Sequence, residues 1–230
     1  MRDGPFAVSY APKMSLHPVT LSFDNGPEPG TTERVLDILA ERGIGATFFV
    51  IGRKFATRCG HALAARARAE GHRVGNHTFF HLGPLGTASA DAAAEEIGAT
   101  QELLGDLAPE KLFRPVGGGV LGPHLLSPAA RDLLVAGGYT CVLWNAVPRD
   151  WAEPEAWVRT AQAQIEHHRK AGTPTALVLH DLPTGAMDHL PGFLDRMADS
   201  GVAFVQTFPE ETVIIREGRP MPDCARYVGG

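Results

Sequence analysis

The chain has 230 residues, of which 44% are hydrophobic and 20% are charged. This length and composition are typical of one globular domain, and they exclude a disordered chain, a coiled coil and a fibrous protein. The formal net charge of −5 provides no basic surface, so we expect neither nucleic acid nor a membrane as a partner.

The cysteines and the N-terminal segment indicate the cellular compartment of the protein. Three cysteines are too few and too scattered for a disulfide framework or a thiolate metal site: Cys59, Cys141 and Cys224. Residues 1–18 lack a basic segment followed by an apolar run, so they do not resemble a secretory signal. No stretch approaches the roughly 18 apolar residues that a membrane span needs. We therefore expect reduced thiols and a cytoplasmic protein, or a chain that has already been trimmed.

Short apolar runs alternate with helical patterns from end to end. In chain order, the patterns predict strand 19–23, helix 31–42, strand 46–51, helix 62–70, strand 73–75, helix 89–104, strand 111–113, helix 128–136, strand 139–144, helix 154–171, strand 176–179, helix 189–200 and strand 202–205. Thr31 or Thr32 can cap the first helix, and Gly43 ends it.

About seven strands that alternate with helices predict an α/β fold with a mostly parallel sheet. At this length we expect a closed or partly closed (β/α) barrel of a single domain, residues 19–215. Residues 1–18 form an N-terminal extension. Residues 216–230 form a C-terminal tail, rich in glycine, proline and charge, which we expect to be loosely packed.

Polar side chains stand at or just past the C-terminal ends of five predicted strands: Asp24, His77, Arg114, Asp150 and His180. All such ends face the same mouth of a parallel barrel, where catalytic groups collect. Taken singly, each has a structural explanation, such as a turn aspartate or a hydrogen-bonded core histidine. Five at five strand ends favour an active site.

His77 and His81 lie four residues apart. On a helical turn the two imidazoles would share one face and reach one metal ion, although chance spacing is a fair alternative in a chain with ten histidines. Gly75-Asn76 before the pair and Gly83-Pro84 after it indicate a strand-end loop. Because no cysteine lies nearby, we expect an open site with nitrogen and oxygen ligands, suited to Zn²⁺ or a similar ion.

These segments resemble the ordered motifs of one enzyme family. The matching pieces are Ser22-Phe-Asp-Asn-Gly26, His77-Thr-Phe-Phe-His81, Arg114-Pro-Val-Gly-Gly118, Arg149-Asp-Trp151 and Leu177-Val-Leu-His180. In order and spacing they are similar to polysaccharide deacetylases of the NodB-homology type, carbohydrate esterase family 4. The resemblance covers roughly residues 19–208 and implies a distorted (β/α) barrel.

The resemblance also implies roles for single residues. His77 and His81 would bind the metal, with Asn25 at the position of its third protein ligand. Asp24 would be the general base, and Arg114 would hold it ionised.

Other matching positions would complete the reaction site. His180 would be the general acid, with Asp150 fixing its tautomer. The backbone N–H of Gly117 would stabilise the oxyanion. The remaining substrate contacts would come from Trp151 and from two leucines that wall a pocket for the acetyl methyl group, Leu177 and Leu179.

Two positions depart from the family pattern. Asn25 replaces an aspartate, so the site loses a negative charge and metal binding should weaken. Some branches of the family also carry Asp-Asn-Gly, so the change need not abolish catalysis. Gly117 replaces a tyrosine, which removes an aromatic face that could pack against a sugar and leaves a wider loop.

The expected function is metal-dependent removal of N-acetyl groups from an amino sugar, oligosaccharide or polysaccharide, with Zn²⁺ or another divalent transition metal. One alternative is a metal-independent hydrolase of a small or cyclic amide on the same fold, which Asn25 and the lack of a signal peptide favour. The other is an inactive carbohydrate-binding relative, against which the retained Asp24, Arg114, Asp150 and His180 argue.

Overall fold

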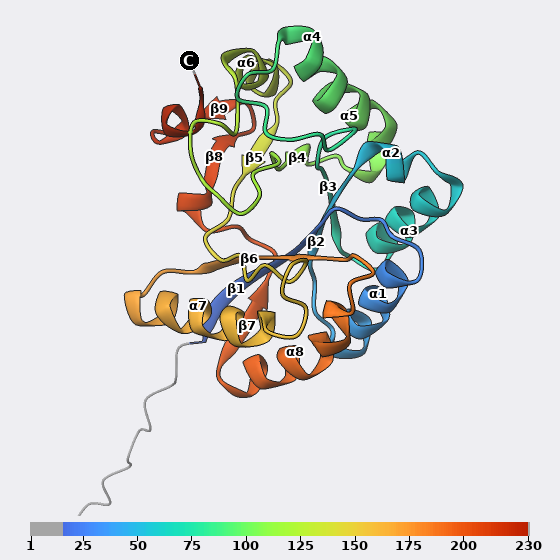
Figure 1. Ribbon diagram of the computed structural model, residues 1–230, viewed down its shortest axis with the longest axis vertical. Helices are drawn as coiled ribbons and strands as arrows, with labels where there is room; N and C mark the ends of the chain where they lie inside the picture. Colours follow the sequence, from blue (N-terminus) through green and yellow to red (C-terminus); the bar gives the residue numbers. More distant parts are fainter. Residues whose placement is uncertain (1–15, 230) are drawn as a thin grey trace, which may run out of the picture.

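Nine strands form one curled sheet in the computed structural model, which describes residues 16–229 (Figure 1). The strands are β1 (His17–Asp24), β2 (Thr47–Val50), β3 (Arg73–Asn76), β4 (Leu112–Phe113), β5 (Thr140–Val142), β6 (Thr175–His180), β7 (Val202–Val205), β8 (Val213–Arg216) and β9 (Arg219–Pro220). Most of the expected N-terminal extension lies outside the described residues, and its last two positions, His17 and Pro18, belong to β1.

The sheet order shows a distorted barrel. Strands β6, β1, β2, β3, β4 and β5 are neighbours in that order and all pair in parallel, while β7 pairs in parallel with the first half of β1. Past β5 the chain bends to the other edge of the sheet, where Ala146 forms a parallel bridge with Leu177 of β6. The predicted (β/α) barrel is therefore confirmed.

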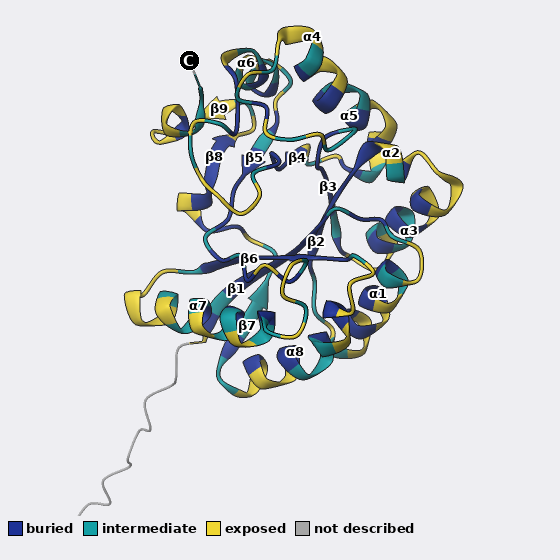
Figure 2. Cartoon of the chain, viewed as in Figure 1, coloured by how far each residue is buried: buried dark blue, intermediate teal, exposed yellow. Residues whose placement is uncertain are grey.

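Within residues 16–229, eight α-helices lie on the outside of the curled sheet (Figure 1). They are α1 (Thr31–Arg42), α2 (Gly52–Phe55), α3 (Arg58–Ala69), α4 (Ala90–Ala93), α5 (Ala99–Leu104), α6 (Pro128–Ala136), α7 (Trp157–Ala171) and α8 (Leu190–Asp199). Figure 2 shows their exposed outer faces and the strands that they cover, which are mostly buried apart from the intermediate β7 and the exposed β9. None of the helices in residues 16–229 is long and apolar enough to cross a membrane.

The alternation of side chains along β1 explains how the barrel positions its polar groups. Val19, Leu21 and Phe23 are fully buried and join the main apolar cluster together with side chains of α1, α7 and α8. Because successive side chains of a strand point to opposite faces, Ser22 and Asp24 face the inside of the barrel. The same sequence pattern thus packs the helices outside and presents polar groups inside.

Several local expectations were wrong. The sheet contains two strands that the patterns missed: β8, antiparallel to β5, and β9, which forms a hairpin with β8. The C-terminal tail is not loosely packed, since Cys224 is buried in a second apolar cluster and Val228 bridges to Leu126. Residues 94–98 inside the expected helix 89–104 are π-helical.

The first helix also begins differently from the expectation. Its N-cap is Gly30, whose backbone N–H is accepted by the Glu33 carboxylate, rather than Thr31 or Thr32. The Thr32 hydroxyl instead donates to the buried Asp181 carboxylate, next to His180. This threonine therefore ties the start of α1 to the end of β6.

Candidate active site

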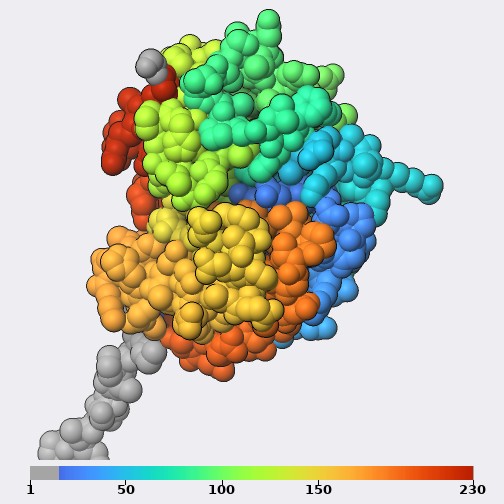
Figure 3. All heavy atoms as spheres, viewed as in Figure 1, coloured from blue at the N-terminus to red at the C-terminus, as the bar shows by residue number. Residues whose placement is uncertain are grey.

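A pocket of about 250 Å³ opens at the C-terminal ends of the parallel strands. Asp24, Asn25, His77, His81 and His180 all line it. In the space-filling view, the segments around residues 120 and 150 lie on the same face, with blue atoms of the chain's first part between them (Figure 3). The structure thus brings the sequence-predicted polar residues together at one mouth.

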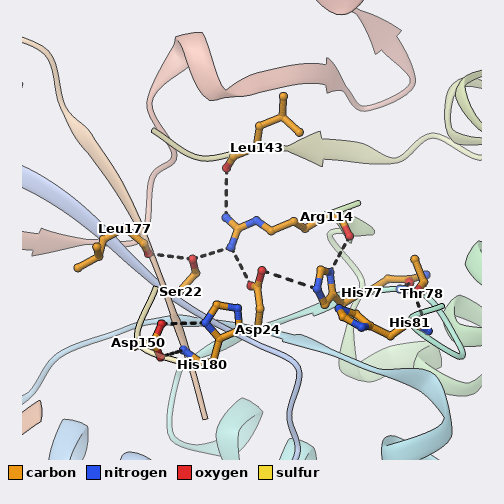
Figure 4. A network of polar contacts seen from close by, with 11 residues as sticks. Ser22, Asp24, His77, Thr78, His81, Arg114, Leu143, Asp150, Leu177 and His180 are labelled. Carbon is orange, nitrogen blue, oxygen red and sulfur yellow. Dashed lines mark hydrogen bonds and ion pairs between the residues drawn. The ribbon is translucent and has the colours of Figure 1, made fainter. Parts of the chain in front are cut away.

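Asp24 is held by a buried arginine that follows β4, across the inside of the barrel. Arg114, which is fully buried, donates through Nη1 to Asp24 Oδ1 at 2.9 Å and to Ser22 Oγ at 2.7 Å (Figure 4). The guanidinium also lies 4.1 Å from the centre of the Phe49 ring, a cation–π contact that stabilises the buried charge. Sequence reasoning missed Ser22 as a partner, although its alternation with Asp24 on β1 places both on the inner face.

The charge of Arg114 decides the ionisation of Asp24. Burial by itself raises the pKa of Asp24, but the nearby Arg114, His77 and His180 together outweigh burial, so the pKa lies below its usual value. The carboxylate is therefore ionised at neutral pH and can accept a proton.

His180 is held by a buried aspartate. Asp150 accepts from the His180 backbone N–H at 2.8 Å and pairs with the ring Nδ1 at 2.9 Å (Figure 4). Burial lowers the pKa of His180, but the hydrogen bond and charge of Asp150, with Asp24 and Asp181, outweigh burial and the pKa is raised. The Trp151 ring packs edge-on against the imidazole, with centroids 4.5 Å apart. His180 is thus oriented and readily protonated.

The two histidines of the 77–81 segment lie on a loop and not on a helical turn. Thr78 and His81 both have positive φ, 66° and 59°, which excludes a continuous right-handed turn. The loop nevertheless brings the rings of His77 and His81 within 4.9 Å, centre to centre. The two rings therefore lie together on the expected strand-end loop, while their shared binding of a metal stays a prediction.

Two polar side chains that sequence reasoning missed hold this loop in shape. The Asn76 side chain accepts from the Thr78 backbone N–H at 2.9 Å. Glu96, in the π-helical segment, accepts from the N–H groups of Phe79 and Phe80 at 2.9 and 3.0 Å. Asn76 could have been found as a turn-forming residue directly before His77, whereas nothing local in the sequence pointed to Glu96.

The protonation of His77 suits a metal ligand. Its Nδ1 lies 2.8 Å from the Arg114 carbonyl oxygen, and because a carbonyl only accepts, Nδ1 carries the proton and Nε2 keeps its lone pair. Burial is the main cause that lowers the pKa of both histidines, and that of His81 falls to about 4. Both rings are therefore neutral at pH 7 and able to bind a cation.

Asn25 completes a donor set that fits a divalent metal. Asn25 lines the same pocket as the two imidazoles, and its buried Oδ1 has no hydrogen-bond partner. No group of three His, Cys, Asp or Glu side chains that could hold a metal occurs in residues 16–229. With Asn25 as the third donor, the set would be two nitrogens and one amide oxygen, which suits Zn²⁺ or a similar ion.

The prediction that Leu177 and Leu179 wall the pocket is wrong. Both are fully buried under the helix layer and do not reach the mouth: they belong to the main apolar cluster with Trp157 and Phe193. The reason is the two-residue period of β6, which turns Val178 toward the pocket instead. Other apolar residues that line the pocket, and that sequence reasoning missed, are Trp144, Val147 and Leu182.

Gly117 lines the pocket, as predicted, but its loop is not simply opened by the missing side chain. A Cβ at this position would lie 2.5 Å from Cη2 of Trp144 and 2.7 Å from Cδ2 of Leu125. The Trp144 ring therefore occupies the space beside residue 117, and an aromatic face is present in the pocket from a different strand end.

The pocket contains an ionised carboxylate, two neutral imidazoles and a third imidazole that is hydrogen-bonded to a carboxylate. A hydrolase uses such groups to activate water and to protonate a leaving group. Comparisons with known proteins give the family. The family model for polysaccharide deacetylase matches residues 12–134. The chain belongs to this family, and it is a hydrolase of carbon–nitrogen bonds other than peptide bonds.

Individual relatives agree with this assignment. The chain is 33% identical over 170 residues to a chitooligosaccharide deacetylase of Rhizobium leguminosarum, covering 71% of each chain. It is 31% identical over 165 residues to a peptidoglycan-N-acetylglucosamine deacetylase of Bacillus cereus, covering 71% of this chain and 72% of the relative. A family 4 carbohydrate esterase from Streptomyces lividans in complex with acetate superimposes with a TM-score of 0.68 at 26% identity, covering 86% and 96%.

Proposed function

We propose that the protein is a metal-dependent deacetylase that hydrolyses the N-acetyl group of an amino sugar. The observation that carries the proposal is the pairing of an ionised Asp24 with a readily protonated His180 in one pocket. The relatives support the substrate class, because two are named as deacetylases of N-acetylated carbohydrates. Acetate, with which the Streptomyces lividans esterase is in complex, is a product of such a reaction.

His77 and His81 would hold the metal through their free ring nitrogens, with the Asn25 side-chain oxygen as the third donor. When bound, a divalent ion would acidify a water molecule and polarise the acyl carbonyl. The Arg114 carbonyl that accepts from His77 Nδ1 would fix the ring and direct its other nitrogen, as such outer contacts generally do.

Asp24 and His180 would move the two protons of the hydrolysis. As the oxygen of water bonds to the acyl carbon, Asp24 takes the proton that the water loses. The Gly117 backbone N–H donates to the oxyanion of the tetrahedral intermediate. The carbon–nitrogen bond then breaks while His180 gives its proton to the departing amine, and Asp150 stabilises the imidazolium beforehand. Acetate and a free amine leave.

A metal-independent hydrolase of a small or cyclic amide is the second candidate, and the neutral side chain of Asn25 favours it. Release of acetate from N-acetylglucosamine, its β-linked oligomers and a panel of small amides, measured with and without chelator, separates the candidates. The first proposal expects acetate from the sugars and loss of the reaction in chelator. Turnover of small amides that is unchanged by chelator would overturn it, and an Asp24→Asn protein serves as the inactive control.

A further inference from the structure

The residues that directly follow two pocket-lining segments, here called the rim, are apolar and exposed. Five large hydrophobic side chains in residues 16–229 are exposed, and three of them directly continue segments that line the pocket. Leu82 follows His81 and is 85% exposed, while Val120 and Leu121 follow Gly119 and are 60% and 41% exposed. Exposed aliphatic side chains that directly adjoin pocket-lining residues point to a binding surface there.

The wall of the pocket is also apolar wherever it is not catalytic. Apart from Asp24, Asn25 and the three histidines, no lining side chain carries a charge, a hydroxyl or an amide. The remaining lining residues are Pro115, Val116, Gly117, Gly118, Gly119, Trp144, Val147, Trp151, Val178 and Leu182. A groove that follows a hydrophilic sugar chain needs side-chain hydrogen bonds to hydroxyl groups, and this part of the wall offers only the indole N–H groups of Trp144 and Trp151.

We infer that the preferred substrate is a single N-acetylamino sugar that carries a hydrocarbon aglycone, and that Leu82, Val120 and Leu121 bind the hydrocarbon. This inference rests on the proposed function, which it makes more specific. A pocket of about 250 Å³ has room for about one sugar ring, whose C–H face can pack on Trp144 and Trp151. Whatever is attached to that sugar then lies against the aliphatic rim.

The physical reason is the transfer of hydrocarbon out of water. Each methylene buried against the rim raises the affinity about fourfold, whereas a second sugar at the same place would lose hydrogen bonds to water without gaining side-chain partners. The rim therefore discriminates by what the sugar carries.

The test compares three glycosides of N-acetylglucosamine at concentrations below micelle formation: methyl, hexyl, and the hydrophilic dimer N,N′-diacetylchitobiose. Both kcat/KM for acetate release and Kd from quenching of tryptophan fluorescence are measured, because binding needs no turnover. The rim variant combines Leu82→Ser, Val120→Ser and Leu121→Ser. Leu103→Ser is the matched control, since Leu103 is 45% exposed on α5 and does not line the pocket.

We expect the hexyl glycoside to exceed the methyl glycoside and the dimer at least about tenfold in kcat/KM and in affinity. The rim variant should lose this advantage while its activity on the methyl glycoside is unchanged, and Leu103→Ser should behave as wild type. A dimer preferred over the hexyl glycoside, or a hexyl advantage that survives in the rim variant, would overturn the inference. Absence of acetate release from all three compounds would overturn the proposed function instead. The measured Kd values would then still show whether the rim binds the hydrocarbon chain.

Discussion

His77 and His180 are two histidines that line the same pocket, and the Nδ1 atom of each ring contacts a polar partner. The partner of His77 is the neutral carbonyl of Arg114, whereas the partner of His180 is the carboxylate of Asp150. Both rings are buried, and burial lowers the pKa of each. For His77 burial dominates and the pKa falls; for His180 the carboxylate outweighs burial and the pKa rises.

The charge of the group that contacts Nδ1 therefore decides whether a histidine suits the role of a metal ligand or that of a general acid. A ring that stays neutral keeps a lone pair for a cation, and a ring that is readily protonated has a proton to give. The two sides of the pocket can therefore be separated by substitutions that change either a reacting group or its partner.

The largest effect is expected from removing a reacting group. Asp24→Asn or His180→Ala should lower turnover by about 10²-fold or more, typical of a lost general base or acid. Folding should be retained, because both side chains face the pocket. Steady-state acetate release and thermal unfolding measured side by side check this. Turnover close to wild type in either protein would remove that residue from its role.

Substituting either proposed histidine ligand of the metal should remove the bound metal. His77→Ala or His81→Ala should abolish retention of Zn²⁺ after loading and desalting, measured by elemental analysis. The exposed His61, on α3, provides the control, and His61→Ala should retain metal as wild type does. Equal metal in wild type and the His77→Ala, His81→Ala double variant would contradict the proposed site.

Replacing the charged partner should make His180 resemble His77. Asp150→Asn keeps a hydrogen-bonding side chain but removes the charge that raises the His180 pKa. The general acid would then lose its proton at lower pH, so the alkaline limb of the rate–pH profile should move to lower pH. The acidic limb, which reflects the base, should stay in place. An unshifted alkaline limb would show that another group donates the proton.

Asn25→Asp should raise the affinity of the proposed metal site for a divalent ion. A carboxylate attracts a divalent ion more strongly than an amide oxygen does, so Zn²⁺ should bind more tightly in a calorimetric titration of metal-free protein. Activity at limiting metal should be equal or higher. The same substitution placed on His81→Ala is the control, in which the gain should be smaller. Equal Zn²⁺ affinity in wild type and Asn25→Asp would mean that residue 25 does not face the metal, and the metal-independent candidate would gain support.

The smallest effect on the reaction is expected at a leucine outside the pocket. Leu177→Ala should lower the free energy of unfolding by about 2–5 kcal/mol, because it opens a cavity in the main apolar cluster. KM should not change, whereas Val178→Ala, on the pocket wall, should change KM with a smaller loss of stability. A raised KM in Leu177→Ala alone would restore the original prediction for this residue.

Sequence patterns predicted the barrel and the polar strand ends because both follow from local regularities. The strand Val202–Val205 and the helix Pro128–Ala136 have the predicted bounds. The β8–β9 hairpin was missed because its strands gain their partners from β5 and from each other. The residues that flank His77 predicted its strand-end loop, but not the contacts from Asn76 and Glu96 that hold this loop with positive φ values.

By itself, the sequence determined which side chains stand at the strand ends and therefore which chemistry the mouth of the barrel contains. The tertiary structure decided the rest, because the deciding contacts join residues far apart in the chain. Arg114 and Asp24 are 90 residues apart, and Asp150 and His180 are 30 apart. The period of a strand gives two faces but not which one is inside, so only packing placed Val178 rather than Leu177 at the pocket. Burial and neighbouring charge, which set each pKa, likewise exist only once the strands meet.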